Sequence, residues 1–469
     1  MCSSESLAGF DWSGLVSAKR KTNLVYSREL LQLAGPLILS NLAYTLLGAL
    51  DTIFMGRVGA TELGAVGVAS ALFLAASSLL RGTVGSVMVV VSQAYGAEDN
   101  KRIREAVQHY AVLALLLAPL GLAMPALFRG FFKLTRPQEA VGILALRYIS
   151  IRAWEMPLSL LSKVMGGFLL GIGNSRVPML VSWITVMVNM VANYVLVFGK
   201  FGFPRMELAG AAWGTVVSQA VQVTLFLFFV LKLYGDELGL MRAFPLPSWD
   251  EIKGMLRLGF PMGLADSVDL AAFGVFMTFL ARLGTVELAA SQVANQLNDI
   301  AFMPSFAIGM ATSSLVGRSL GAGSTNKAEK YGFAGLTVGV ALMGTLAACY
   351  WLFPGVFVMP FTSDPEVRML SRKILRIIAV YQVLDVTRIA FCGSLNGAGE
   401  TRFTGLTTLI AAGIVFIPVT YIGAFVLEFG LWGAWAGPLT HAVLLVMIFG
   451  NRFCKGVWKK AWDGARVAK

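Results

Sequence analysis

The sequence predicts an all-α integral membrane protein with twelve transmembrane helices in two six-helix lobes, related by a pseudo-two-fold axis along the membrane normal. Two observations carry this prediction: a strongly apolar composition and an internal repeat. Of the 469 residues, 57% are hydrophobic and only 14% are charged, whereas a soluble domain has about 25% charged residues. Such a chain cannot bury all of its apolar surface when it folds in water, so we expect the lipid bilayer to surround it.

Twelve apolar stretches are long enough to cross a hydrocarbon core about 30 Å thick, which takes about 20 helical residues. We expect the spans at residues 31–55, 62–93, 105–128, 140–171, 177–199, 208–233, 255–281, 286–317, 329–356, 374–397, 403–427 and 430–451. The 50 glycines are typical of membrane helices that pack closely, because small residues let two backbones approach.

The repeat aligns the two halves of the chain at an offset of 225 residues, without a gap over the first two spans of each half. It pairs Pro36 with Pro261, Arg57-Val-Gly-Ala-Thr-Glu-Leu with Arg282-Leu-Gly-Thr-Val-Glu-Leu, and the turn ending at Arg176 with the turn ending at Arg402. Each copy holds an even number of spans, so both copies enter the membrane from the same side. Two such lobes around a central cavity suit transport by alternating access.

The basic residues set the expected orientation. Lys and Arg are in excess on the segments that are cytoplasmic when the N-terminus is inside, so we expect both termini in the cytoplasm and the protein in the inner cell membrane. We therefore interpret the net charge of +12 as the excess of basic residues that orients the chain in the membrane, and not as a sign of nucleic-acid binding. The predicted division is 1–30 N-terminal segment, 31–233 N-terminal lobe, 234–254 linker, 255–451 C-terminal lobe and 452–469 basic tail.

Polar residues inside the N-terminal lobe are candidates for a cation site, because an ionisable group inside a bilayer is costly. Asp51 lies in the first span, and Asn189 and Asn193 share one face of the fifth. Their oxygens, with the hydroxyl of Thr215, are of the kind that binds a hard cation. Two alternatives stay open: Asp51 is an interfacial acid near Arg57, or the amides only bond helices together.

The C-terminal lobe holds more acids within its spans. Asp269 and Asp385, with Tyr381 one turn before Asp385, form the main candidate cation or proton site, and Asp266 and Asp299 are secondary candidates. If two of these carboxylates converge, their repulsion and their desolvation both favour the protonated form. A pair of this kind holds either one proton or one sodium ion.

Other charged residues have structural interpretations. Arg388 follows Asp385 by three residues, so the two can form an ion pair without a transported cation. Glu155 and Lys163, eight residues apart in the fourth span, are expected to share a structural network. The two histidines lie in separate halves, so no metal site is expected, and no nucleotide-binding loop or other cofactor site is recognised.

Four motifs carry a resemblance to a known family: Asp51-Thr-Ile-Phe-Met-Gly-Arg-Val-Gly, Asn189-x-x-x-Asn193-Tyr, Gly-Thr-Val-Glu-Leu at 284–288, and Tyr381-x-x-x-Asp385. With the duplicated plan they resemble the multidrug and toxic compound extrusion family, MATE, over residues 30–450, closest to its NorM-type branch. The resemblance implies two six-helix lobes around a V-shaped cavity and export of cationic or amphipathic compounds, driven by sodium or proton entry. It also implies that Asp51 is the family's acid in the first helix, with Asn189 and Asn193 as its partners in the fifth. A C-lobe cation site at Asp269, Tyr381 and Asp385 is implied as well.

Two departures from the family pattern leave the coupling ion open between Na⁺ and H⁺. Asp269 stands where the NorM-type pattern usually has Glu, with Asp266 as a rival for that role. Asn193 stands where the DinF-type branch usually has Asp.

The expected function is secondary antiport of organic cations or amphipathic drugs, with small-molecule substrates and membrane lipids as partners, no nucleic acid, and a monomeric protein. The first alternative is a flippase for a lipid-linked precursor. That function calls for several cationic residues in the cavity, and we expect acids to outnumber bases there. An intramembrane enzyme is the second alternative, but no cluster of His and acids at a catalytic spacing supports it, so no enzymatic activity is expected.

Overall fold

The computed structural model describes residues 23–135, 139–240 and 245–459, and this part of the chain is helical and holds no strand. The first half contains α2 (Asn23–Gly56), α3 (Ala60–Gly85), α4 (Val87–Gly96), α5 (Asn100–Leu122), α6 (Met124–Thr135), α7 (Glu139–Arg152), α8 (Glu155–Gly171), α9 (Arg176–Phe198) and α10 (Leu208–Leu238). The predicted N-terminal segment up to residue 22 and the tail from residue 460 lie outside the described residues.

The second half contains α11 (Trp249–Leu283), α12 (Thr285–Gly321), α13 (Thr325–Leu352), α14 (Pro354–Val358), α15 (Pro365–Gly397), α16 (Thr401–Ala411), α17 (Ile417–Tyr421) and α18 (Gly430–Cys454). Two π-helical segments, η1 (Ala412–Phe416) and η2 (Ile422–Val426), lie before and after α17. The second half thus repeats the plan of the first.

Ten helical stretches of the described chain are long and apolar enough to cross a membrane. The other two of the twelve spans are α7 with α8, which are interrupted at Ala153 and Trp154, and α15, which carries Arg376, Asp385 and Arg388 along its length. All twelve predicted spans therefore fall on helices, and the prediction of a twelve-helix membrane fold is confirmed.

The repeat is visible in the two loops that open α3 and α12. Gly59 and Gly284 are the N-caps of these helices, and a Cβ at either glycine would meet the carboxylate of the glutamate three residues later, Glu62 or Glu287. In both loops the glutamate side chain therefore folds back over the cap, and a side chain in place of either glycine would displace it.

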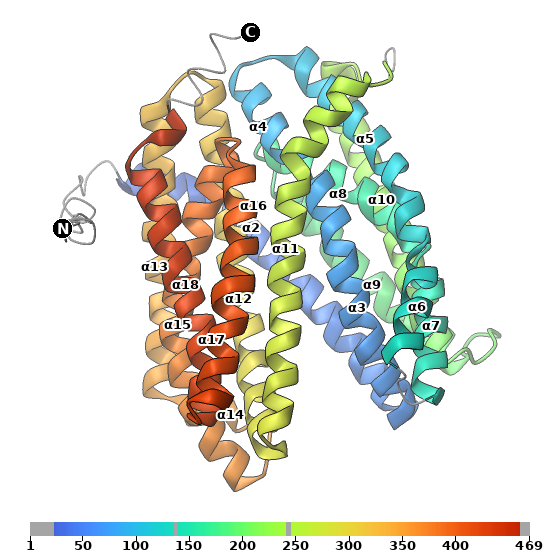
Figure 1. Ribbon diagram of the computed structural model, residues 1–469. Helices are drawn as coiled ribbons and strands as arrows, with labels where there is room; N and C mark the ends of the chain where they lie inside the picture. Colours follow the sequence, from blue (N-terminus) through green and yellow to red (C-terminus); the bar gives the residue numbers. More distant parts are fainter. Residues whose placement is uncertain (1–22, 136–138, 241–244, 460–469) are drawn as a thin grey trace, which may run out of the picture.

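Two apolar cores correspond to the two groups of helices in Figure 1. One core lies among α3 to α10 and the other among α11 to α18. Helix α2 joins both, because Leu30, Leu33 and Leu37 in its first half pack against the second group, whereas Phe54 and Met55 near its end belong to the first core. The first helix therefore crosses between the lobes.

The lobes are locked together at the end that carries the loops 97–99 and 322–324, which is uppermost in Figure 1. A Cβ at Gly96 would meet the backbone of Arg318, and a Cβ at Gly321 would meet the backbone of Gln93, so the helices carrying these residues touch backbone to backbone. The Gln93 amide also donates a hydrogen bond to the Gly397 carbonyl oxygen at 3.1 Å. Toward the other end of the view, the two groups of helices diverge.

Arg318 reinforces this closed end from the second half. Its guanidinium lies over the ring of Tyr95 at 5.6 Å and fills the space beside Gly173, where a Cβ would lie 2.6 Å from Nη1. Gly173 has a φ of +82°, which favours glycine. One side chain of α12 therefore holds both α4 and the turn after α8.

Candidate functional site

A cavity of about 710 Å³ lies between the lobes. Its walls come from α2, α3, α4, α7, α8, α9 and α10 on one side and from α11, α12, α15 and α16 on the other. Its volume is in the range of ligand-binding pockets, about 300–1,000 Å³. Both lobes thus share one space large enough for a drug-sized molecule.

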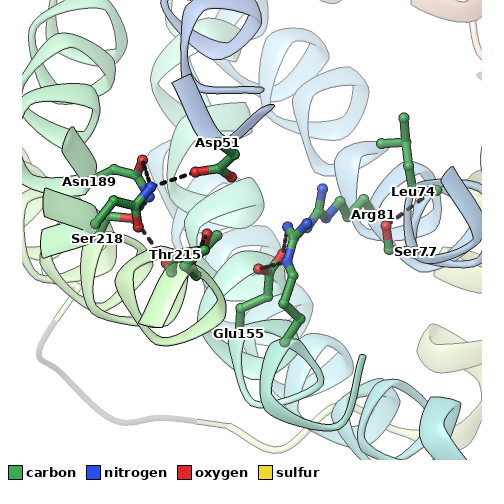
Figure 2. Close-up of polar contacts among 11 residues, drawn as sticks. Asp51, Leu74, Ser77, Arg81, Glu155, Asn189, Thr215 and Ser218 are labelled. Carbon is green, nitrogen blue, oxygen red and sulfur yellow. Dashed lines mark hydrogen bonds and ion pairs between the residues drawn. The ribbon is translucent and has the colours of Figure 1, made fainter. Parts of the chain in front are cut away.

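Asp51 lies on the N-lobe wall of this cavity and is only 7% exposed. The amide nitrogen of Asn193 donates a hydrogen bond to Asp51 Oδ1 at 2.5 Å and also lies 3.1 Å from Asn189 Oδ1. The amide of Asn189 in turn reaches Ser218 Oγ at 3.4 Å (Figure 2). The structure therefore brings Asp51, Asn189 and Asn193 into one polar cluster, formed by α2, α9 and α10.

Gly214 on α10 makes room for this cluster, because a Cβ there would overlap Asn193 Oδ1. That oxygen is buried and accepts no hydrogen bond from the described residues. Thr215, the next residue, lines the cavity but donates its hydroxyl to the Ala211 carbonyl oxygen at 3.1 Å within its own helix. Its oxygen remains available as an acceptor, so Thr215 borders the cluster without bonding to Asp51.

A second polar group consists of Arg81, Arg152 and Glu155. Figure 2 shows Arg81 and Glu155 of this group beside the first cluster. Glu155 is buried and binds Arg81 Nη2 at 2.7 Å and Arg152 Nε at 2.8 Å. Arg152 also stacks over the Phe73 ring at 4.7 Å. A buried carboxylate thus holds two guanidinium groups on the cavity wall.

The expected network between Glu155 and Lys163 is wrong. The two residues are eight positions apart on α8, which is about 12 Å along a helix, and Glu155 is bonded to Arg152 and Arg81 instead. Neither arginine was paired with Glu155 in the sequence-based prediction, which considered only Lys163 as its partner. The spacing of three between Arg152 and Glu155 was the signal that could have found one of them.

In the C-lobe, Arg388 lies between the two principal acids. Its Nη1 lies 3.0 Å from Asp269 Oδ2 and its Nη2 lies 2.8 Å from Asp385 Oδ1. Tyr381 is buried, and its hydroxyl reaches Asp385 Oδ1 at 3.5 Å. The predicted trio does converge, but a guanidinium occupies the space between its carboxylates, as the ion-pair alternative expected.

The two secondary acids lie apart from this cluster. Asp266 lines the cavity and is accessible from it. Asp299 is exposed on α12, one turn before the cavity-lining Phe302, and does not itself line the cavity. Asp299 therefore has no place in either polar cluster.

The charged residues that line the cavity are balanced. Four are acids and four are bases: Asp51, Glu155, Asp266 and Asp269, against Arg81, Arg152, Lys163 and Arg388. The expectation that acids outnumber bases there is wrong, because Arg81 and Arg152 line the cavity beside Glu155, a carboxylate with which the sequence did not pair them.

The two lobes differ at the position of Asp51. Its partner in the repeat is Phe276, which is buried and packs against Trp435 and Phe416 with ring centroids 5.0 and 6.0 Å away. An aromatic cluster therefore fills the place in the C-lobe that the polar cluster holds in the N-lobe.

The model of the family described as MatE matches this chain twice, at residues 36–195 and 261–422. The chain belongs to the MatE family. The two matches begin at Pro36 and Pro261, the prolines that the repeat superposes, and the resemblance to the MATE family is confirmed. Membership also makes the chain a membrane transporter and not an enzyme.

Relatives of the chain match it over nearly its full length. A probable multidrug resistance protein NorM of Thermotoga maritima is 28% identical over 437 residues, which cover 92% of this chain and 93% of that protein. The multidrug resistance protein MdtK of Pectobacterium atrosepticum is 27% identical over 440 residues, which cover 90% and 95%.

Solved MATE structures share the fold. The crystal structure of MATE in the straight conformation has a TM-score of 0.82 at 22% identity and covers 93% of this chain and 97% of its own. The eukaryotic MATE transporter AtDTX14 has a TM-score of 0.82 at 18% identity and covers 95% and 99%. At these identities the likeness concerns the fold.

Proposed function

We propose that this transporter is a secondary antiporter, which exports organic cations or amphipathic drugs in exchange for Na⁺ or H⁺. The observation that carries the proposal is a buried acid, Asp51, which belongs to a polar cluster at the wall of a cavity shared by both lobes. An acid held in this way can bind either a cation or a proton, and its charge changes the stability of the cluster around it. The relatives named multidrug resistance proteins support the substrate class.

The amide of Asn193 suggests how the N-lobe would take a cation. Its nitrogen lies between Asp51 Oδ1 and Asn189 Oδ1, while its own Oδ1 is buried and has no hydrogen-bond partner among the described residues. Rotation of this amide would turn the third oxygen toward the other two and remove the hydrogens between them. Three converging oxygens suit Na⁺, and protonation of Asp51 is the alternative that needs no rotation.

The C-lobe acids have a different place in this proposal. Arg388 already neutralises much of the charge of Asp269 and Asp385, so a cation would have to displace the guanidinium to bind them. The cation site at Asp269, Tyr381 and Asp385 stays a prediction, and we propose Asp51 as the principal coupling acid.

Orientation and domain limits follow the same reasoning. We propose that both termini lie in the cytoplasm of a cell whose inner membrane holds the protein, and that the closed end with Arg318 faces the cytoplasm. The cavity then opens to the outside, the state in which a substrate leaves and an ion enters. The lobes are proposed as 31–233 and 255–451; helices α10 and α11 extend into the linker, to Leu238 and from Trp249.

A lipid-precursor flippase is less well supported by the cavity. Of the four bases that line it, Arg81, Arg152 and Arg388 are bound to carboxylates, and Lys163 has no such partner among the described residues. A flippase calls for several cationic residues, so a phosphate head group would have to break these ion pairs to reach more than one base, and breaking a buried pair is costly. Efflux of small amphipathic molecules asks for no such rearrangement.

The test is efflux of a fluorescent organic cation from proteoliposomes, first under a sodium gradient and then under a proton gradient. Asp51→Asn is expected to reduce gradient-driven efflux at least about tenfold, because it removes the charge with little change in volume. Asp250→Asn is the matched control, since Asp250 is an exposed acid outside the cavity. Normal efflux by Asp51→Asn would contradict the proposal.

A further inference from the structure

A groove of about 340 Å³ lies between α13 and α15, on the surface of the C-lobe. It is lined by apolar side chains from the two helices: Ala347, Ala348, Trp351, Ala379, Val380, Val383 and Leu384. None of these residues lines the cavity between the lobes. Trp351 is 51% exposed and Val380 is 48% exposed, so the groove opens outward, to the lipid that surrounds a membrane helix.

Three bases precede the groove along α15. They are Arg372, Lys373 and Arg376, and all three are exposed. Arg372 and Lys373 come four and three residues before Arg376, which itself comes three residues before Ala379 and four before Val380. Residues three or four apart share a face of a helix, so the bases and the groove follow one another on the same face.

The bases lie at the end of the groove that is nearer the membrane surface. Helix α13 runs away from the closed end, and Trp351 is the last of its residues to line the groove. Helix α15 starts at the opposite end of the molecule, beside α14 in Figure 1, and the Arg372 guanidinium packs there against Gly355, where a Cβ would lie 3.3 Å from Cζ. Tryptophan is enriched where hydrocarbon meets the lipid head groups, so we place Arg376 at the level of the head groups.

No acid in the described part of the chain compensates these bases, because none of the three takes part in an ion pair or a hydrogen bond there. The nearest acids along the helix, Asp364 and Glu366, lie at its start, and Asp364 accepts a hydrogen bond from the backbone N–H of Glu366 at 2.8 Å. A single base at an interface extends to water without any ligand. Three bases on one face, directly above an apolar groove, instead match a molecule with an anionic head and an apolar chain.

We propose that this groove binds one phospholipid with an anionic head group. Its phosphate lies among Arg372, Lys373 and Arg376, since the guanidinium group binds phosphate through paired hydrogen bonds. One acyl chain then lies along the groove toward Leu384, which is eight residues and about 12 Å along the helix from Arg376.

The bound lipid would hold α13 against α15 from the membrane side. Asp385 lies on the other, buried side of α15, where it binds Arg388. An occupied groove would therefore steady the helix that carries the ion pairs of the C-lobe. The inference concerns the outer surface of this lobe and is independent of the transported substrate and of the coupling ion.

Trp351 provides a direct readout, because bromine atoms on a lipid chain quench the fluorescence of a tryptophan that they contact. The purified full chain is placed in phosphatidylcholine nanodiscs that contain a small, equal mole fraction of brominated phosphatidylglycerol or brominated phosphatidylcholine. The two probes have the same chains, but only the first has a net negative head group. The chain has 10 tryptophans, so the quenching that remains in Trp351→Phe is subtracted.

We expect brominated phosphatidylglycerol to quench Trp351 at least about fivefold more efficiently than brominated phosphatidylcholine, because one base near an anionic lipid contributes about that factor. Replacement of both Arg372 and Arg376 by Gln should remove this preference while it leaves quenching by phosphatidylcholine in place. Replacement of both by Lys should retain most of the preference, because it keeps the charge.

Two further variants separate the parts of the site. Arg129→Gln with Lys133→Gln is the matched control, since these exposed bases lie one turn apart near the end of α6 and outside the groove; it should keep the preference of the parent. Ala348→Phe fills the groove and leaves the bases unchanged, so it should lower the quenching by phosphatidylglycerol.

Three outcomes would overturn the inference. Equal quenching of Trp351 by the two lipids in the parent would show that the groove does not select an anionic head group. A preference that persists when Arg372 and Arg376 are both Gln would show that these bases do not bind the phosphate. A preference lost as fully in the Arg129 and Lys133 control would assign it to the overall charge of the protein and not to this site.

Discussion

Replacement of Arg388 by Gln should leave Asp269 and Asp385 facing each other without a counter-charge. In the native protein the guanidinium lies 3.0 Å from one carboxylate and 2.8 Å from the other. Gln is shorter and uncharged, so it cannot bridge the two acids. The variant therefore isolates the electrostatic role of the arginine.

The size of the effect follows from burial. One pair of unit charges at about 4 Å attracts by about 4 kcal/mol at an effective dielectric constant of about 20, and the loss of one partner of a buried ion pair typically costs about 3–5 kcal/mol. The Asp385 side chain is 3% exposed but that of Asp269 is 28% exposed, so cavity water screens the second pair. We therefore expect the free energy of unfolding to fall by about 3 kcal/mol, at the lower end of that range.

The assay is thermal unfolding in nanodiscs, followed by tryptophan fluorescence at a series of sodium concentrations. We expect Arg388→Gln to unfold at a lower temperature than the parent and to regain stability as sodium is added, because two unpaired carboxylates can share a cation. The control is Asp385→Asn with Arg388→Gln, in which one acid is removed with the base. This double variant should be less destabilised than the single one.

An unfolding temperature equal to that of the parent would refute the reasoning, because the ion pairs would then contribute nothing. So would a double variant that is no more stable than Arg388→Gln alone. An Asp51→Asn protein stabilised by sodium as strongly as Arg388→Gln would instead show that the C-lobe binds the ion despite its arginine.

Three further predictions concern the N-lobe and the closed end. Sodium binding to the parent should weaken as the pH falls between about 8 and 5, because protons compete for the same carboxylate, and isothermal titration should show this dependence lost in Asp51→Asn. Gly214→Ala should displace the Asn193 amide, lower the free energy of unfolding by about 1–3 kcal/mol through overpacking and reduce efflux. Gly235→Ala, on the same helix but with ordinary contacts, should leave efflux unchanged. Equal efflux by the two variants would argue against a role for the polar cluster around Asp51. Arg318→Ala should loosen the closed end and increase labelling of a cysteine introduced into the cavity by a reagent added from the cytoplasmic side, and unchanged labelling would show that the backbone contacts suffice.

The fold was largely predictable, because hydrocarbon allows only structures that satisfy their backbone hydrogen bonds internally. Long apolar stretches therefore locate helices, and the repeat locates their counterparts. The interruption between α7 and α8 was not predicted. It lies within a single apolar stretch, and Pro157 in the first turn of α8 is the signal that could have marked it, because proline is tolerated in the first turn of a helix but not in its interior.

The polar sites were predictable only in part, because spacing along the chain reports contacts within a helix and not between helices. Asn189 and Asn193 share a face by their spacing of four, and Arg388 could be placed beside Asp385 by its spacing of three. The bond from Arg388 to Asp269 joins residues 119 positions apart, and the bond from Arg81 to Glu155 joins residues 74 apart. No pattern in the local sequence indicates contacts between residues so far apart.

The aromatic cluster around Phe276 bears on how a duplicated protein becomes directional. If the ancestral unit carried an acid at this position, two copies would have held two equivalent ion sites, each able to drive the same motion. With Phe276 in the second copy, this position is ionisable only in the first half, so under the proposed antiport it would exchange at most one ion in each cycle. Divergence of a single buried position would then have made the two halves unequal, with the ion bound at this position in one of them only.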